Sequence, residues 1–262
     1  MRSDQLAEVK DFLTDNGFPN KVDTAVVLGS GLSGFASYLG KPVKIRYQQI
    51  PEFPKATVQG HDGSLIAGTI GNQNVMIFSG RFHHYEGYSF STTVLPVHLS
   101  NLFSAEKIII SNAAGAVNTK LNVRDLVVIE DIFRLFQKVS VQPSQKFIYN
   151  LYSWAEKTKE IASETGLHVQ YGTYLYVKGP NYETKAEIRA FQRLGIDVVG
   201  MSTVPELIEA TRIDLPAIAI SLVTNMAAGL GSAKLDHSEV KHAADSRKED
   251  FAKLVIELIK KL

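Results

Sequence analysis

The chain has 262 residues, of which 45% are hydrophobic and 21% charged, and its formal net charge is +1. Basic and acidic side chains number 28 and 27, so we expect no general attraction to nucleic acid or to an anionic membrane. The chain has no cysteine, which excludes disulfides, a thiol nucleophile and thiolate metal ligands. No apolar run reaches the roughly 18 residues of a membrane span, and the polar start predicts a helix rather than a signal peptide. We therefore expect a cytoplasmic protein with a single domain over residues 1–262.

A helix beginning near Ser3 and ending at Gly17 precedes the first predicted strand, Thr24–Leu28. This strand is a continuous apolar run, as expected for a strand covered on both faces. It leads directly into Gly29-Ser30-Gly31, whose glycines let backbone amides approach a ligand closely. The letters G-S-G-L-S-G match the dinucleotide fingerprint, but the acidic residue expected about 20 residues later is not evident. We interpret this turn as a phosphate-sized site around Ser30.

Residues 41–60 contain three prolines and are predicted to be irregular or an edge strand. His61 lies in the turn that follows, and its residue type alone indicates a surface turn residue more than a ligand. Ser64–Ile70 is the next predicted strand, and a hairpin at residues 71–74 leads into the buried strand Val75–Phe78.

The octet Gly80–Gly87 follows that strand and reads G-R-F-H-H-Y-E-G. If the segment is extended, Arg81, His83 and Tyr85 point to one side, because alternate side chains of an extended chain share a side. Arginine offers a planar fork of donors that suits an oxyanion, and histidine titrates near neutral pH. The octet is therefore a candidate anion site, and the alternative interpretation is a solvated loop with a packed tyrosine.

The second half of the chain alternates predicted strands with predicted helices. Helices are expected at 92–103, at 149–164, after the capping box Thr184-x-x-Glu187, after Thr203-x-x-Glu206, and from 236 to 260 with His237 in its first turn. Strands are expected at 107–111, 125–130, 171–177, 197–200 and 216–223. This order predicts an α/β fold.

Polar or small residues follow most of the predicted strands. Open α/β sheets bind ligands outside the carboxyl ends of their strands, so these residues are expected to meet in one cleft with an anion-binding half. The residues concerned are Ser30, Arg81, Ala113, Glu183, Ser202 and Asn225.

Several of these segments together resemble one known family, the trimeric purine nucleoside phosphorylases. The matching segments run in the family's order from about residue 24 to 240, and they are L-G-S-G-L at 28–32, G-R-F-H at 80–83 through Gly87, N-A-A-G at 112–115, G-P at 179–180 with E-T at 183–184, G-M-S-T-V-P-E at 200–206 and T-N at 224–225. The resemblance implies an α/β domain with a mixed central sheet flanked by helices. It also implies a homotrimer, a role in purine salvage, and reversible phosphorolysis of a purine nucleoside to free base and pentose 1-phosphate, with inorganic phosphate as co-substrate and neither a metal nor an organic cofactor.

The resemblance also implies roles by position. Phosphate would be held by Ser30, His61, Arg81, His83, the amide of Ala113 and Ser202. The nucleoside would be contacted by Tyr85, Tyr182, Glu183, Met201, Asn225 and His237, with Tyr85 and His237 at the pentose. Glu86 would be the acidic partner of His83, so the catalytic groups implied are His83, Glu86, Glu183 and Asn225.

The residue types at the base end predict a preference. A carboxylate at Glu183 can accept from N1–H of a 6-oxopurine, and adenine has no N1–H. Leaving a buried polar group unpaired is costly, so we expect inosine, guanosine and their 2′-deoxy forms to be preferred over adenosine.

One segment departs from the family pattern. Members usually carry a longer insert near 131–150, with an Arg-Phe-x-x-Met-Ser run and an aromatic side chain that reaches a neighbouring subunit's pocket. That run is absent here, and Phe133, Phe136 and Phe147 are the candidates to replace the aromatic contact. Met226 stands where some members carry lysine.

Three alternatives remain open from the sequence. A 5′-methylthioadenosine phosphorylase shares the fold, but Glu183 with Asn225 and the polar His237 argue against it. A nucleosidase that uses water would not need Ser30, Arg81 and Ser202 together. The third alternative is a nucleoside-binding protein that has lost turnover.

Overall fold

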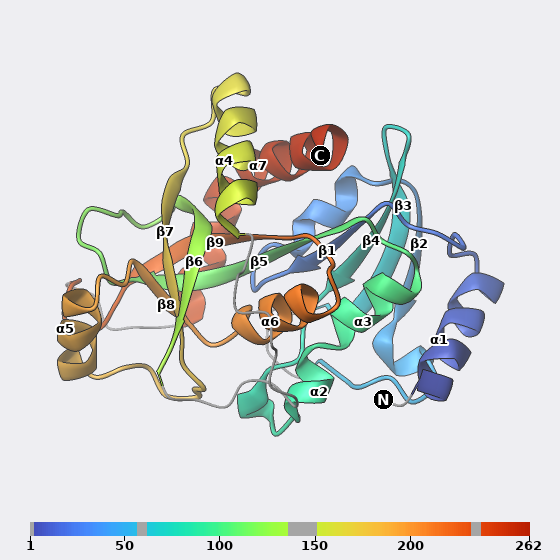
Figure 1. Ribbon diagram of the computed structural model, residues 1–262, viewed down its shortest axis with the longest axis horizontal. Helices are drawn as coiled ribbons and strands as arrows, with labels where there is room; N and C mark the ends of the chain where they lie inside the picture. Colours follow the sequence, from blue (N-terminus) through green and yellow to red (C-terminus); the bar gives the residue numbers. More distant parts are fainter. Residues whose placement is uncertain (1–2, 57–61, 136–150, 232–236) are drawn as a thin grey trace.

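The computed structural model describes residues 3–56, 62–135, 151–231 and 237–262 (Figure 1). Its centre is a mixed sheet whose strands follow the order β2-β3-β4-β1-β5-β8-β7-β6-β9. In chain order the strands are β1 (Thr24–Leu28), β2 (Gly40–Arg46), β3 (Ser64–Ile70), β4 (Gln73–Ser79), β5 (Lys107–Ala116), β6 (Leu126–Arg134), β7 (Gln170–Tyr176), β8 (Val198–Gly200) and β9 (Ala217–Met226).

Strand β5 belongs to two parts of this sheet. It pairs in parallel with β1 on one side and with β9 on the other, and its last residues also pair with β8. Because β8, β7, β6 and β9 pair in turn, the strands β5-β8-β7-β6-β9 close into a ring. The ring therefore shares β5 with the open part, β2-β3-β4-β1.

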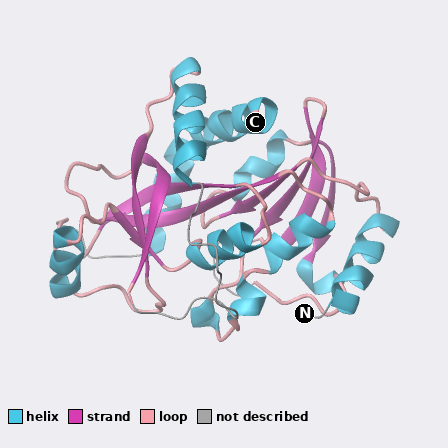
Figure 2. Cartoon of the chain, in the orientation of Figure 1, coloured by secondary structure: helices cyan, strands magenta, loops and turns pink. Residues whose placement is uncertain are grey.

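Helices cover both faces of the sheet (Figures 1 and 2). The α-helices are α1 (Ser3–Asp15), α2 (Phe90–Thr93), α3 (Leu95–Leu102), α4 (Leu151–Glu164), α5 (Lys185–Arg193), α6 (Val204–Arg212) and α7 (His237–Lys261). Short 3₁₀ helices occur at Ser33–Tyr38, Tyr47–Gln49 and His84–Glu86. None of the helices in the described part of the chain is long and apolar enough to span a membrane.

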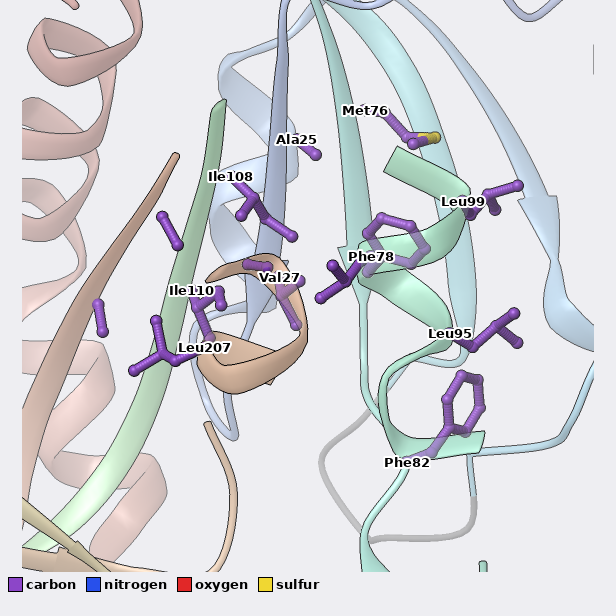
Figure 3. Packing of buried hydrophobic residues seen from close by; sticks show 14 of the residues in the cluster. Ala25, Val27, Met76, Phe78, Phe82, Leu95, Leu99, Ile108, Ile110 and Leu207 are labelled. Carbon is purple, nitrogen blue, oxygen red and sulfur yellow. The ribbon is translucent and has the colours of Figure 1, made fainter. Parts of the chain in front are cut away.

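Successive side chains of a strand point to opposite faces of the sheet, and helices cover both faces here, so both sets of side chains are apolar. On β1, Ala25 and Val27 pack into a cluster with α1, α3 and α6, whereas Val26 and Leu28 pack against α4 and α7. Figure 3 shows the first of these clusters, in which Val27 and Phe78 lie with Leu207 of α6 and Leu95 of α3. A strand that is covered on both faces reads as a continuous apolar run, as predicted for Thr24–Leu28.

Most predicted elements are confirmed, and four predictions are wrong in extent. Strands β5 and β9 continue through Ala116 and Met226, so Ala113 and Asn225 lie within strands and not beyond their ends. The extra residues are held by pairing of β5 with β8 and β9, which the local sequence does not reveal. Strand β6 likewise extends to Arg134, and the single helix expected over 92–103 is two helices separated at Val94.

Candidate functional site

A cleft of about 720 Å³, its open mouth included, lies where the ends of β1, β4 and β8 meet the far halves of β5 and β9. Ten of the residues predicted from the sequence line it: Ser30, Arg81, His83, Tyr85, Ala113, Tyr182, Glu183, Met201, Ser202 and Asn225. The predicted single cleft is therefore present, although two of these residues reach it from within strands.

Strand register places the first two anion-site candidates beside each other. Leu28 of β1 is opposite Ser79 of β4, so the turn that carries Ser30 and the loop that carries Arg81 leave the sheet side by side. Gly29 has to be glycine because a Cβ there would lie 2.6 Å from Cα of Asn112. This close approach brings the turn against β5.

The guanidinium of Arg81 is only 1% exposed and is held at three points. Nη1 donates to the hydroxyls of Ser202 at 2.7 Å and Thr203 at 3.2 Å, and Nη2 donates to the carbonyl of Ser111 at 2.6 Å. All three acceptors are neutral, so they orient the cation without cancelling its charge. A fixed, desolvated arginine is well suited to an oxyanion.

The carboxylate nearest to Arg81 belongs to Glu206, whose Oε1 lies 3.8 Å from Nε. Burial raises the pKa of Glu206, and the charge of Arg81 opposes that shift. Neither Oε1 nor Arg81 Nε has a hydrogen-bond partner among the described residues. Oε2 of the same carboxyl accepts from the backbone N–H of Thr203 at 3.1 Å.

Thr203 has a strained backbone at the start of α6. Its φ is +71°, and the N–H of Val204 donates to the carbonyl of Ser202 at 2.7 Å, which makes a tight three-residue turn. A β-branched residue at positive φ is rare, and such strain is concentrated at functional sites. The turn places Ser202 beside the N-terminus of α6, where backbone dipoles favour anions.

His83 is fixed by Glu86, the acidic partner that the family resemblance implies for it. Oε1 of Glu86 lies 2.8 Å from Nδ1 of the ring and accepts from the His83 backbone N–H at 2.8 Å. Burial lowers the pKa of His83, although the hydrogen bond to Glu86 acts in the opposite direction. The ring stacks on Tyr85, with centroids 4.7 Å apart.

The octet is not extended throughout, because His84–Glu86 forms a 3₁₀ turn. The predicted grouping survives this correction, since Arg81, His83 and Tyr85 all line the cleft. Phe82 packs away from it into the core against Tyr47 and Phe53. The turn also lets Glu86 reach back to His83, which an extended segment would not allow.

The other end of the cleft carries an amide and a carboxyl. Asn225 Oδ1 accepts from the hydroxyl of Thr224 at 2.9 Å, and its Nδ2 donates to the carbonyl of Met226 at 3.1 Å. Burial raises the pKa of Glu183, with a smaller contribution from the charge of Glu187 in the same direction. The bonds of Asn225 to Thr224 and Met226 leave one amide hydrogen and one lone pair of Asn225 for a ligand.

Tyr182 and Met201 also line the cleft. Tyr182 is 46% exposed, and a Cβ on Gly179 would lie 2.4 Å from the sulfur of Met201. Gly179 has a φ of +68°, so glycine is required there by both the backbone and the packing.

Sequence reasoning missed four polar residues that support the site: Ser111, Asn112, Thr203 and Thr224. The first three carry or receive hydrogen bonds around Arg81, and Thr224 orients Asn225. Their signal in the sequence is faint, although polar residues inside apolar strands do indicate buried hydrogen-bond networks.

Several predicted residues fall outside what the structure describes. His61, Phe136 and Phe147 lie outside the described residues, and for His237 only the helical backbone is described. Phe133 is partly buried against the cluster of Leu175 and Val199.

Comparison with known proteins gives one consistent result. A model of the Phosphorylase superfamily matches residues 23–260. "Purine nucleoside phosphorylase 1" of Bacillus subtilis (strain 168) is 38% identical over 265 residues, covering 96% of each chain. The protein of the same name from Geobacillus stearothermophilus is 36% identical over 272 residues, covering 100% of this chain and 99% of its own.

Solved structures agree with the sequence relatives. Purine nucleoside phosphorylase of Schistosoma mansoni in complex with adenosine has a TM-score of 0.89 to this chain at 31% identity, covering 100% of this chain and 98% of the other. The complex with inosine gives the same score and identity, covering 97% of the other chain.

Proposed function

The chain belongs to the purine nucleoside phosphorylases of the Phosphorylase superfamily, and from this we propose that it splits 6-oxopurine nucleosides with phosphate. The substrates proposed are inosine, guanosine and their 2′-deoxy forms, and the products are the free base and (deoxy)ribose 1-phosphate. The observation that carries the proposal is the meeting of Arg81 and Ser202 with Glu183 and Asn225 in one cleft.

Arg81, Ser202, Ser30, His83 and the amide of Ala113 form the phosphate half of this proposal. The buried guanidinium supports it, because a fixed cation positions a nucleophilic oxyanion against the anomeric carbon. His61 belongs to the same half by resemblance. Donors that are already oriented need not reorganise as the oxocarbenium-like transition state forms.

Glu183 and Asn225 form the purine half. As the bond to the sugar breaks, negative charge moves onto the base and N7 takes up a proton. The free lone pair of Asn225 Oδ1 suits N7–H, and its free amide hydrogen suits O6. The carboxylate of Glu183 would accept from N1–H, which adenine does not possess.

Tyr85, Tyr182, Met201 and His237 are proposed to enclose the pentose and the face of the base. Glu86 holds the ring of His83 in this arrangement. We propose no metal and no organic cofactor for the reaction, so activity should survive dialysis against a chelator.

A coupled assay of base release from inosine, with and without phosphate, tests the reaction. Release that requires phosphate supports the proposal, release without phosphate indicates a nucleosidase, and binding of inosine without release indicates a protein that has lost turnover. Methylthioadenosine as substrate tests the remaining alternative. Equal kcat/KM for adenosine and inosine would contradict the role given to Glu183.

We also propose a homotrimer, as the resemblance implies. Light scattering on the purified protein measures the mass directly, and a mass near three times the chain's 28.9 kDa is expected. A monomer would contradict this part of the proposal and leave the assay above unaffected.

A further inference from the structure

A row of buried polar side chains leads from the middle of the sheet to the anion end of the cleft. The hydroxyl of Ser221 on β9 donates to Asn112 Oδ1 at 2.8 Å, and Asn112 Nδ2 on β5 donates to the hydroxyl of Thr203 at 2.9 Å. Asn112 and Ser221 meet because they are paired across β5 and β9. All three side chains belong to residues that are at most 1% exposed.

The donors and acceptors present determine which way each hydroxyl in this row donates its proton. Thr203 Oγ1 accepts from Asn112 Nδ2 and also from Arg81 Nη1, so both of its lone pairs are occupied. Its proton is then available for Ser202 Oγ, which lies 3.2 Å away.

The hydroxyl of Ser202 is also occupied as an acceptor. Its Oγ accepts from Arg81 Nη1 at 2.7 Å, and a bond from Thr203 fills its second lone pair. The remaining group is its own O–H, for which the hydroxyl oxygen of Tyr174 is a protein acceptor, and Ser202 lines the cleft, where a ligand oxyanion can take the place of that acceptor. Its backbone is held as well, since the Ser202 N–H donates to the hydroxyl of Tyr174 at 3.3 Å.

We propose that Ser221, Asn112 and Thr203 are positioning residues that set the direction of these hydrogen bonds, so that the hydroxyl of Ser202 donates into the cleft toward phosphate. The inference rests on the proposed phosphorolysis. The orientation of the Asn112 amide is its central element: with the amide reversed, its oxygen would face Thr203, Thr203 would donate to it, and Ser202 would lose the donor that directs its own proton outward.

Two substitutions change the row: Ser221 lies outside the lining of the cleft, whereas Asn112 is one of its lining residues. Ser221→Ala removes the donor that holds the amide oxygen, and Asn112→Asp replaces the NH₂ group that faces Thr203 with an acceptor. We expect the KM for phosphate to rise about 3- to 10-fold in Ser221→Ala and about 10- to 100-fold in Asn112→Asp, since one hydrogen bond to a charged group is weakened or lost. The KM for inosine at saturating phosphate should stay within about twofold of the original in both.

Ser100→Ala is the matched control. Ser100 is 0% exposed like Ser221, and its hydroxyl donates to the carbonyl of Pro96 within α3, away from the cleft. Ser100→Ala removes an equally buried serine hydroxyl, and its KM values for phosphate and for inosine should be unchanged. Calorimetric titration with inorganic phosphate gives a second readout, and the Kd should rise in the same order as the KM.

The outcomes separate the two proposals. A phosphate KM and Kd within twofold of the unmodified protein in either test variant would overturn the positioning role, as would a parallel rise in the KM values of both substrates. Turnover of inosine by the unmodified protein that does not depend on phosphate would instead overturn the proposed reaction, and it is measured first.

Discussion

The proposed phosphate half of the cleft contains Arg81, a residue that is both buried and charged. Arg81 is 1% exposed, and its hydrogen bonds go to two hydroxyls and a carbonyl. Glu206 lies 3.8 Å from Nε, beyond hydrogen-bonding distance. A cation held this way is already desolvated and oriented before the ligand arrives, so little of the binding free energy is spent on reorganisation.

Replacement of Arg81 by alanine should abolish productive use of phosphate. We expect Arg81→Ala to raise the KM for phosphate or lower kcat/KM by at least about 100-fold, because several charge-assisted hydrogen bonds are lost together. Initial rates against phosphate concentration measure the change. Arg189→Ala, at an exposed position on α5, is the control and should behave as the unmodified protein. An unchanged phosphate saturation curve in Arg81→Ala would remove Arg81 from the proposed site.

The base end should respond to a single amide-to-acid change. In Asn225→Asp, a carboxylate can accept from the 6-amino group of adenosine and can no longer donate to O6 of inosine. We expect the ratio of kcat/KM for adenosine to that for inosine to rise about 10-fold or more, as one hydrogen bond is gained and another lost.

The control for Asn225→Asp is the same substitution at an asparagine away from the cleft. Asn101→Asp, at an exposed position of α3, adds the same charge away from the cleft and should leave the ratio unaltered. A ratio in Asn225→Asp equal to that of the unmodified protein would show that this side chain does not read position 6 of the purine.

At the scale of single elements, α5 shows how a helix start supports the cleft. The hydroxyl of Thr184 accepts from the Glu187 N–H at 3.2 Å, and Glu187 Oε2 accepts from the Thr184 N–H at 2.7 Å. This reciprocal box fixes the chain immediately after Glu183. The position of that carboxyl therefore depends on the helix as well as on its own contacts.

Removal of the cap should be visible in stability and in binding. We expect Thr184→Ala to lower the free energy of unfolding by about 1 kcal/mol, and to raise the KM for inosine while the KM for phosphate stays the same. Urea unfolding and steady-state rates measure the two effects. Thr14→Ala, near the end of α1, is the control for loss of a half-buried threonine hydroxyl that does not cap a helix start. A rise in the phosphate KM of Thr184→Ala would contradict the assignment of this helix to the purine end.

The capping box of α5 could be predicted from the sequence because it is local. The similar letters before α6 predicted the helix start but not what Thr203 does there. Its hydroxyl is bonded by Arg81 and Asn112, 122 and 91 residues away, and its backbone has a φ of +71°. Contacts over such distances come from the tertiary fold, and a single sequence holds no direct signal for them.

The same limit explains the strands that were predicted too short. Asn112–Ala116 consists of small residues that are poor strand formers, so they read as a segment beyond the strand. They remain in β5 because β8 and β9 pair with them on either side. The sequence therefore predicted which residues gather at the cleft, whereas the closure of the ring that holds two of them could not be predicted.

At the scale of the whole molecule, the cleft lies where the open part of the sheet and the closed ring share β5. Phosphate candidates come from loops after β1 and β4 of the open part, and purine candidates come from β9 and the segment after β7 of the ring. Ser202 follows β8 and reaches Arg81 across the junction. The proposed phosphate half thus draws residues from both parts of the sheet, whereas Glu183 and Asn225 of the proposed purine half come from the ring.

Stability of the face that carries α3 and α6 should depend on pH through Glu209. Burial by itself would raise the pKa of this carboxyl, but hydrogen bonds from His98 and Arg212 outweigh burial and hold the pKa at about 2. His98 Nε2 lies 3.0 Å from Oε1, and Arg212 Nε donates to Oε2 at 2.9 Å. Because the carboxyl binds protons less readily in the folded state than in the unfolded state, it stabilises the fold above a pH of about 4.5 and loses this contribution as the pH falls toward about 2.

Glu209→Gln tests this linkage. The variant should be less stable than the unmodified protein at pH 7, and its free energy of unfolding should fall less steeply between about pH 5 and pH 3, because the carboxyl that takes up the proton is gone. Urea unfolding at a series of pH values measures both effects, with the exposed Glu160→Gln on α4 as the control. Parallel curves for Glu209→Gln and the unmodified protein would show that the contacts of Glu209 with His98 and Arg212 do not contribute to acid stability, and that other carboxylates govern unfolding in that range.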